Sequence, residues 1–167
     1  VPVSQIHRIA DTTSFAEAAM AEPLSCCLHG IDLCDVRPAD TVLVIGCGMI
    51  GLLMIQLAKL AGAAQVIAVE PNETARAHAL RLGADCCIDP TRGDPAEALR
   101  QFGAPRVTKV IECVGRPETM MQAVDLAGAR ATVMFFGLTA PAETIAIRPF
   151  ALFKKELTLK SSYINPY

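Results

Sequence analysis

Three glycines and one carboxylate carry the clearest chemistry in this sequence. Gly46, Gly48 and Gly51 have the spacing G-x-G-x-x-G, and Glu70 follows Gly51 by 19 residues. A glycine turn that opens a helix presents unpaired backbone N–H groups to phosphates. A carboxylate about 20 residues later can accept hydrogen bonds from ribose hydroxyls. The spacing therefore predicts a dinucleotide-binding loop.

The segments around these residues are those that such a loop requires. Residues 41–45 form a continuously apolar, β-branched run, typical of a strand that is buried on both faces of a parallel sheet. The apolar run 49–60 is interrupted by only two polar residues, three positions apart, which predicts a helix with one solvated stripe. A second apolar strand, 66–69, leads directly to Glu70. The glycines alone could form a plain turn, but this full context favours the dinucleotide fingerprint.

Each glycine has its own expected role. Gly46 permits a tight turn, Gly48 lets the pyrophosphate approach the backbone, and Gly51 lets the helix pack closely on the strand. Glu70 would accept hydrogen bonds from both adenosine ribose hydroxyls and repel a 2′-phosphate, which favours NAD over NADP. It could also be an ordinary solvated acid at a strand end. Arg76 could contact a 2′-phosphate or simply face solvent from a helix.

Strand-like and helix-like segments alternate along the chain. Strands are expected at 41–45, 66–69, 86–88, 107–113, 131–136 and 157–160. Helices are expected at 14–20, 23–34, 49–60, 73–82, 95–102, 117–126 and 150–155. This alternation predicts an α/β Rossmann fold, a doubly wound six-stranded parallel sheet with helices on both faces.

Ligands of such sheets bind at the carboxyl ends of the strands, near the topological switch point. This rule gathers the glycine turn, Glu70 and the residues after the last three strands, 161–163 included, around one crevice. The predicted cofactor-binding residues are Gly46, Gly48, Met49, Ile50, Gly51, Glu70, Cys113, Val114, Gly115, Phe136, Gly137 and Leu138. A similar sheet could bind S-adenosylmethionine, although methyltransferases usually show a more open G-x-G-x-G motif.

Composition disfavours several other classes of protein. The 167 residues fit one domain, and 15 basic against 17 acidic residues leave no basic field for nucleic acid or an anionic membrane. The longest uncharged apolar stretch, 41–57, is split by three glycines and falls short of a membrane span. Seven cysteines without C-x-x-C or disulfide-like spacing favour a reducing, cytoplasmic setting. We expect the chain, which has no signal peptide at its start, to be part of a longer polypeptide.

Several motifs together resemble those of the zinc-dependent medium-chain alcohol dehydrogenases, in the sorbitol and threonine dehydrogenase branch. They are A-E-P-L at 21–24, V-I-G-x-G-x-I-G at 44–51, L-G-A-D at 82–85, V-I-E-C-V-G at 110–115 and E-L-T-L-K-S-S-Y at 156–163. Their order and spacing cover nearly the whole chain. The resemblance implies an NAD-binding Rossmann domain at 22–167, preceded at 1–21 by a linker and short helix from a missing N-terminal catalytic domain.

The resemblance also implies the chemistry of the intact enzyme. Zinc, held mainly by the separate domain, would act as a Lewis acid on a small alcohol or polyol. Hydride would then pass between the secondary alcohol and NAD. We expect this segment to contain no catalytic residue and to be inactive alone. The competing hypothesis is a stand-alone nucleotide-binding or redox-sensing regulatory module.

Within this segment, the resemblance links one residue to zinc. In the polyol branch the acid of A-E-P-L ligates the metal or its bound water, which points to Glu22, with Cys26 or Cys27 as a lesser alternative. Glu22 could also be an ordinary acid at a helix start. The resemblance further implies a homo-oligomer, and a nicotinamide framed by the backbone around 114–115, 136–138 and 161–163. It gives no role to Glu112 or Tyr163.

Overall fold

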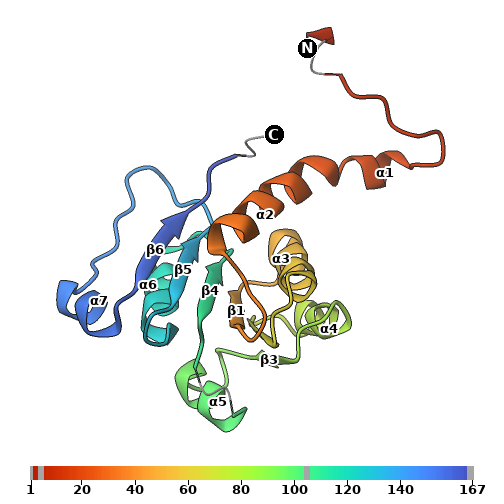
Figure 1. Ribbon diagram of the computed structural model, residues 1–167. Coiled ribbons are helices and arrows are strands. Elements are labelled where there is room, and N and C mark those ends of the chain that lie inside the picture. The colour runs from red at the N-terminus through yellow and green to blue at the C-terminus, as the bar shows by residue number, and fades with distance from the viewer. Residues whose placement is uncertain (1, 4–5, 104–105, 165–167) are drawn as a thin grey trace.

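The computed structural model describes residues 2–3, 6–103 and 106–164. It contains one six-stranded parallel sheet in the order β3-β2-β1-β4-β5-β6 (Figure 1). The strands are β1 (Thr41–Ile45), β2 (Gln65–Val69), β3 (Cys86–Ile88), β4 (Lys109–Glu112), β5 (Thr132–Phe135) and β6 (Thr158–Ser161). The chain runs outward from β1 to β3 and then returns to β4 on the other side of β1. The predicted α/β Rossmann fold is confirmed, and its switch point lies between β1 and β4.

Helices cover both faces of the sheet. They are α1 (Phe15–Ala18), α2 (Ala21–Cys34), α3 (Met49–Leu60), α4 (Glu73–Arg81), α5 (Pro95–Gln101), α6 (Pro117–Leu126) and α7 (Pro149–Lys155). Side chains of α2, α3 and α4 share one apolar cluster with the sheet, and side chains of α5 and α6 share the other. Helices α2 to α4 therefore cover one face of the sheet, and the later helices α5 and α6 cover the other.

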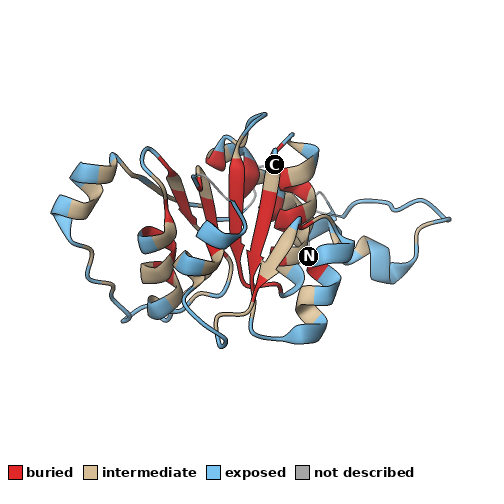
Figure 2. Cartoon of the chain, turned by 90° about the horizontal axis from the view of Figure 1, so that it is seen from below, coloured by how far each residue is buried: buried red, intermediate tan, exposed pale blue. Residues whose placement is uncertain are grey.

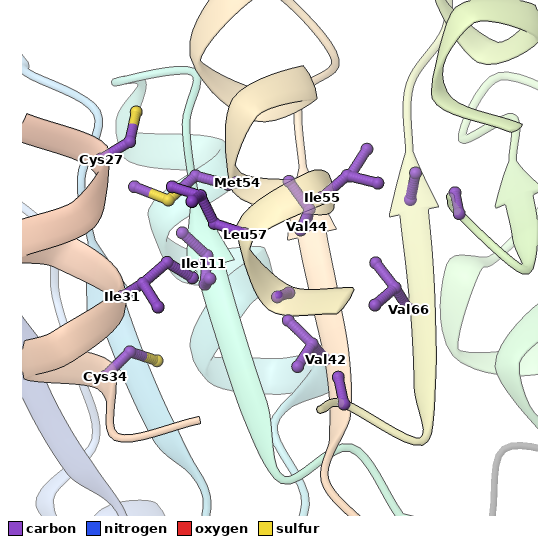
Figure 3. Packing of buried hydrophobic residues seen from close by; sticks show 14 of the residues in the cluster. Cys27, Ile31, Cys34, Val42, Val44, Met54, Ile55, Leu57, Val66 and Ile111 are labelled. Atoms are coloured by element: carbon purple, nitrogen blue, oxygen red, sulfur yellow. The ribbon is translucent and has the colours of Figure 1, made fainter. Parts of the chain in front are cut away.

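The core explains why β1 is apolar without interruption. All five of its residues are buried. Val42 and Val44 pack under α2 and α3, whereas Leu43 and Ile45 face the opposite cluster, because successive strand residues point to opposite faces. Figure 3 shows side chains of α2 and α3, including Met54, over the first of these faces. Burying each such side chain stabilises the fold by about 1.5–3 kcal/mol.

Two predicted helix starts are confirmed by their caps, whereas α2 begins at Ala21, two residues before the expected start. Ser14 Oγ accepts a hydrogen bond from the Glu17 N–H at 3.2 Å, and Glu17 Oε2 accepts one from the Ser14 N–H at 2.8 Å. This is a capping box. Asn72 Oδ1 accepts from the Ala75 N–H at 2.9 Å and so begins α4. These bonds satisfy N–H groups that have no partner within the helix.

Two strands are shorter than expected. The sequence predicts strands at 107–113 and 131–136, but the structure has β4 at Lys109–Glu112 and β5 at Thr132–Phe135. The parallel ladder of β4 with β1 extends only from Lys109 to Glu112. Apolar residues beyond a ladder can be buried without belonging to a strand. Val107, for example, packs in the core ahead of β4.

The end of α2 is held by two lysines from the sheet. Lys109 Nζ donates to the Cys34 carbonyl at 2.9 Å, and Lys160 Nζ donates to the Leu33 carbonyl at 2.7 Å. Cations favour the C-terminal end of a helix, where carbonyl groups lack partners. These contacts account for charged residues on β4 and β6 and anchor α2 to the sheet.

The segment before α2 differs from the rest of the chain. It extends away from the sheet (Figure 1), and Phe15 on α1 is 88% exposed. Figure 2 shows the contrast with the buried central strands. The expected boundary between residues 21 and 22 falls one residue after α2 begins at Ala21, and the assignment of 1–21 to another domain stays a prediction. Among the described residues, no helix combines the length and apolarity that a membrane span needs.

Candidate dinucleotide-binding site

The glycine turn joins β1 to α3 and leaves no room for side chains at two of its three glycines. Gly46 has a φ of 91°, a backbone conformation that residues with a Cβ rarely adopt. A Cβ on Gly51 would overlap the Gly46 carbonyl oxygen. A Cβ on Gly48 would instead meet nothing within 4 Å. Gly46 and Gly51 are therefore required by the fold, whereas the space beside Gly48 is open.

The N-terminus of α3 faces this open space without a side-chain cap. Gly48 is the N-cap residue, and among the residues that the structure describes there is no side-chain cap on the first turn, which begins at Met49. The first N–H groups of a helix lack partners within the helix and carry a partial positive charge. An anion beside Gly48 could therefore accept hydrogen bonds from this turn.

Glu70 is bound to the glycine turn. Its Oε2 accepts a hydrogen bond from the Cys47 N–H at 2.7 Å, and its Oε1 accepts one from the Asn72 N–H at 2.9 Å. The acid therefore joins the end of β2 to the loop after β1, a contact that the sequence analysis did not anticipate. Each carboxylate oxygen has a second lone pair, so Glu70 retains acceptor capacity for a ligand hydroxyl.

Arg76 does not face solvent, so one of the two positions left open for it is excluded. Its side chain is only 14% exposed and forms an ion pair with Asp89 at 3.2 Å. Its Nη1 also donates to the carbonyls of Glu70 at 2.8 Å and Pro71 at 2.6 Å. The guanidinium group thus links the ends of β2 and β3. Hydrogen bonds from Thr91, with weaker help from nearby arginines, lower the pKa of Asp89.

The loops after β4 and β5 meet at Glu112, a residue for which no role was predicted. The side chain is fully buried, and its Oε1 accepts hydrogen bonds from the N–H groups of Val114 at 2.8 Å and Gly115 at 2.9 Å. Its main-chain carbonyl accepts from Gly137 N–H at 2.8 Å. An acid that directly precedes a glycine-containing loop at the end of an apolar strand could have revealed this arrangement.

The side chains around these loops divide into packed and exposed groups. Phe136 packs with the core, and its ring contacts the position that a Cβ on Gly30 would occupy. Met49, Val114 and Leu138 are instead 52%, 41% and 92% exposed. These apolar side chains are available to a ligand, whereas Phe136 could contribute only its backbone. Tyr163 is 84% exposed and acquires no role here.

The predicted metal residues supply an incomplete set of donors. Glu22 is exposed in the first turn of α2, and its Oε1 accepts a hydrogen bond from Cys26 Sγ at 3.3 Å. Cys27 is buried in the core, and burial raises its pKa to about 12, so its thiol stays protonated. Within the described ranges, no three His, Cys, Asp or Glu residues are grouped as a metal site requires. Glu22 and Cys26 could at most complete a site built elsewhere.

The chain was compared with known families and proteins. A model of the zinc-binding dehydrogenase family matches residues 50–166. The chain is 29% identical to sorbitol dehydrogenase from Pongo abelii over 166 residues, which is 96% of this chain and 46% of that protein. It is 32% identical to L-idonate 5-dehydrogenase from Vitis vinifera, covering 99% of this chain and 47% of that protein.

Two solved structures that contain a bound dinucleotide are similar to this chain. A protein from Sinorhizobium meliloti 1021 assigned as a zinc-binding dehydrogenase, and bound to NADP, is 40% identical with a TM-score of 0.94. It covers 100% of this chain, which spans 50% of that structure. An alcohol dehydrogenase from Escherichia coli CFT073 complexed with NADH is 26% identical with a TM-score of 0.89, covering 99% of this chain and 48% of that one. The chain thus spans about half the length of these relatives.

Proposed function

The chain belongs to the zinc-binding dehydrogenase family, and from this premise we propose that it is the dinucleotide-binding domain of an alcohol or polyol dehydrogenase. In the intact enzyme, hydride would pass between a secondary alcohol and the nicotinamide ring. This segment would bind and orient the cofactor without turning over substrate alone. Family membership weighs against a stand-alone regulatory module.

The glycine turn is the observation that carries this proposal. The fold requires glycine at 46 and 51, but contacts within the chain do not require it at 48. Glycine at 48 is explained if a ligand occupies the open space beside it. That space lies at the uncapped N-terminus of α3, where a pyrophosphate would accept backbone hydrogen bonds. A bare structural turn would account for Gly48 only through the preference of a helix N-cap for glycine over larger apolar residues.

The position of Glu70 gives the dinucleotide a direction. If the adenosine ribose lies beside Glu70 at the end of β2, the pyrophosphate crosses the turn after β1, and the other half extends toward β4. The nicotinamide would then reach the loops at Val114–Gly115 and Gly137–Leu138. When bound, the nicotinamide ring gives or accepts a hydride. The protein would fix the ring through backbone groups and the exposed apolar side chains of Val114 and Leu138.

We assign NAD rather than NADP as the preferred cofactor. A 2′-phosphate beside the Glu70 carboxylate would be repelled by roughly 4 kcal/mol for unit charges about 4 Å apart at a protein surface. Arg76, the nearby cation that could offset this repulsion, is engaged with Asp89 and two carbonyls. One similar structure holds NADP and another NADH, so the choice rests on these residues of this chain.

Zinc would be held mainly by a part of the enzyme outside this chain. Glu22 and Cys26 fit a supporting role because a carboxylate and a thiol lie 3.3 Å apart on an exposed helix start. Two donors do not make a zinc site. We therefore propose that Glu22 completes a site whose other ligands come from the N-terminal catalytic domain, to which residues 1–21 would connect.

Exposed aromatic side chains on α7 support the proposal that a second subunit contacts this domain. Phe150 and Phe153 of α7 are 72% and 79% exposed, and their ring centroids are 6.5 Å apart. Such side chains commonly mark a surface that another subunit or domain covers. We propose a homo-oligomer on this basis. The seven cysteines are all free, which supports a reducing cytoplasmic location.

Calorimetric titration tests the cofactor assignment. The protein should bind NAD⁺ more tightly than NADP⁺ at the same salt concentration. ADP-ribose, which lacks the nicotinamide, should compete with NAD⁺. Preference for NADP⁺ would overturn the role given to Glu70, and absence of binding by all three ligands would overturn the proposed function.

A further inference from the structure

Glu112 keeps a carboxylate in the core at the end of a buried strand. The side chain is 0% exposed, and its Oε1 accepts three hydrogen bonds, from the N–H groups of Val114 and Gly115 and from the Thr119 hydroxyl at 2.8 Å. Its Oε2 has no hydrogen-bond partner among the described residues. Burying an acid with one oxygen unpaired is costly, so packing alone does not account for it.

The same residue also holds the loop that follows the neighbouring strand. Its carbonyl oxygen accepts hydrogen bonds from the N–H groups of Phe136 at 3.0 Å and Gly137 at 2.8 Å. A Cβ on Gly137 would lie 2.6 Å from Glu112 Oε2, so glycine is needed for the two loops to close around the carboxylate. A Cβ on Gly115 would lie 2.5 Å from the Leu138 carbonyl oxygen. The two loops are therefore one interlocked unit with Glu112 at its centre.

We propose that Glu112 is a positioning residue that sets these two loops as a single surface for the nicotinamide half of the dinucleotide. The inference rests on the proposed function, which directs that half of the cofactor toward β4 and β5. Glu112 is buried behind the loops and acts through the backbone of Val114, Gly115 and Gly137. Thr119 on α6 holds the carboxylate in the rotamer that reaches both N–H groups. Small displacements of such a surface have large effects on a reacting ring.

A purely structural role would affect all ligands alike, so the test compares two ligands. NADH contains the nicotinamide ring, whereas ADP-ribose keeps the adenosine, the pyrophosphate and the second ribose and lacks only that ring. Affinities are measured by calorimetry on the whole protein. Glu112→Ala should weaken NADH binding by about tenfold, the effect of losing roughly one to two hydrogen bonds. ADP-ribose affinity should change by less than about twofold.

If Glu112→Ala does not fold, milder variants test the positioning role of Glu112. Thr119→Val removes one hydrogen bond to the carboxylate and should weaken NADH binding by about threefold, while Thr119→Ser, which retains the hydroxyl, should restore it. Glu112→Gln keeps an acceptor oxygen and should bind NADH better than Glu112→Ala. The control is Thr108→Val, just before β4 at the opposite end of the strand. It removes a hydroxyl-to-carboxylate bond to Asp40 of 2.7 Å and the bond that Thr108 Oγ1 accepts from the Thr41 N–H at 3.0 Å.

The outcomes separate the two proposals. Selective loss of NADH affinity in the Thr119→Val and Glu112→Ala variants, but not in Thr108→Val, supports the positioning role. Equal weakening of NADH and ADP-ribose, or no change in either, overturns it. If the unmodified protein binds ADP-ribose but gains nothing from the nicotinamide, the positioning role also fails. If it binds neither ligand, the proposed function itself is wrong.

Discussion

Glu70 Oε2 lies 2.7 Å from the amide nitrogen of Cys47, so the acid at the end of β2 accepts a hydrogen bond from the glycine turn after β1. The contact joins residues 23 positions apart and fixes the carboxylate beside the expected phosphate site. Glu70 thus has two functions in this account, as a brace for the loop and as a ribose acceptor. The two functions make different predictions for substitutions.

Replacing Glu70 should alter cofactor choice more than stability. Glu70→Ala leaves the N–H groups of Cys47 and Asn72 without their side-chain partner, which should cost about 1–2 kcal/mol of unfolding free energy. The NAD⁺-over-NADP⁺ affinity ratio should fall by about tenfold or more, because the repulsion of the 2′-phosphate is lost. Denaturant unfolding and calorimetry measure the two effects. A loss of stability with an unchanged affinity ratio would leave Glu70 as a brace only.

Gly51 should be intolerant of any side chain. The Cβ of Gly51→Ala would overlap the Gly46 carbonyl, which is backbone and cannot rotate away, so α3 must shift from β1. We expect a loss of about 3 kcal/mol of unfolding free energy, at the upper end for overpacking. Urea unfolding measures it. A loss below about 0.5 kcal/mol, the size of an ordinary surface change, would show that the helix can move freely here.

Stability should depend on pH through Asp89. Its pKa is lowered in the folded state, mainly by hydrogen bonds from the Thr91 hydroxyl and N–H. The stabilisation is therefore present above the unfolded pKa of about 3.9 and is lost as pH falls through the lower folded value. Wild type should be more stable than Asp89→Asn at pH 7, and this difference should shrink below about pH 4.

Equilibrium unfolding at several pH values checks this expectation. Asp125→Asn, which removes a charge from an exposed site on α6, is the control. A difference between wild type and Asp89→Asn that stays constant from pH 7 to pH 3 would contradict the assigned pKa shift.

The 167-residue chain by itself should retain no stoichiometric zinc. Glu22 and Cys26 provide only two neighbouring donors, and structural or catalytic zinc sites need at least three protein ligands. Metal analysis after dialysis should therefore find substoichiometric zinc, unchanged in Glu22→Gln. Bound zinc at one equivalent, lost in that variant, would mean that the chain assembles a site of its own.

The sequence was sufficient for the fold because burial leaves a periodic pattern. The unbroken apolar run of β1 and the capping box of Ser14 and Glu17 are local signals, and both were confirmed. Contacts between distant segments leave no such pattern. The sequence therefore predicted a ribose-binding role for Glu70 but not its bond to Cys47. It left Arg76 either in contact with a 2′-phosphate or in solvent, and it did not predict the ion pair with Asp89.

In the candidate site too, the features set by local sequence were predicted and those set by distant contacts were not. Glycine spacing predicted the turn at Gly46–Gly51 because steric requirements there are set by nearby backbone. The place of Glu112 at a strand end before a glycine-containing loop was visible in the sequence. Its contacts were not predicted, because they join two loops that meet only in the folded sheet. The strand ends were also missed, since the length of β4 is set by its ladder with β1 rather than by its own residues.

Substitution of Gly48 tests the central claim most directly. Its φ of −69° suits any residue, and a Cβ there meets nothing within 4 Å, so Gly48→Val should fold with a loss of only about 1 kcal/mol at the helix N-cap. The valine would nevertheless occupy the space assigned to the pyrophosphate. Calorimetry should find NAD⁺ and ADP-ribose binding reduced at least about a hundredfold, a loss of roughly 2.8 kcal/mol. A folded Gly48→Val protein that binds both ligands as the wild type does would contradict the account.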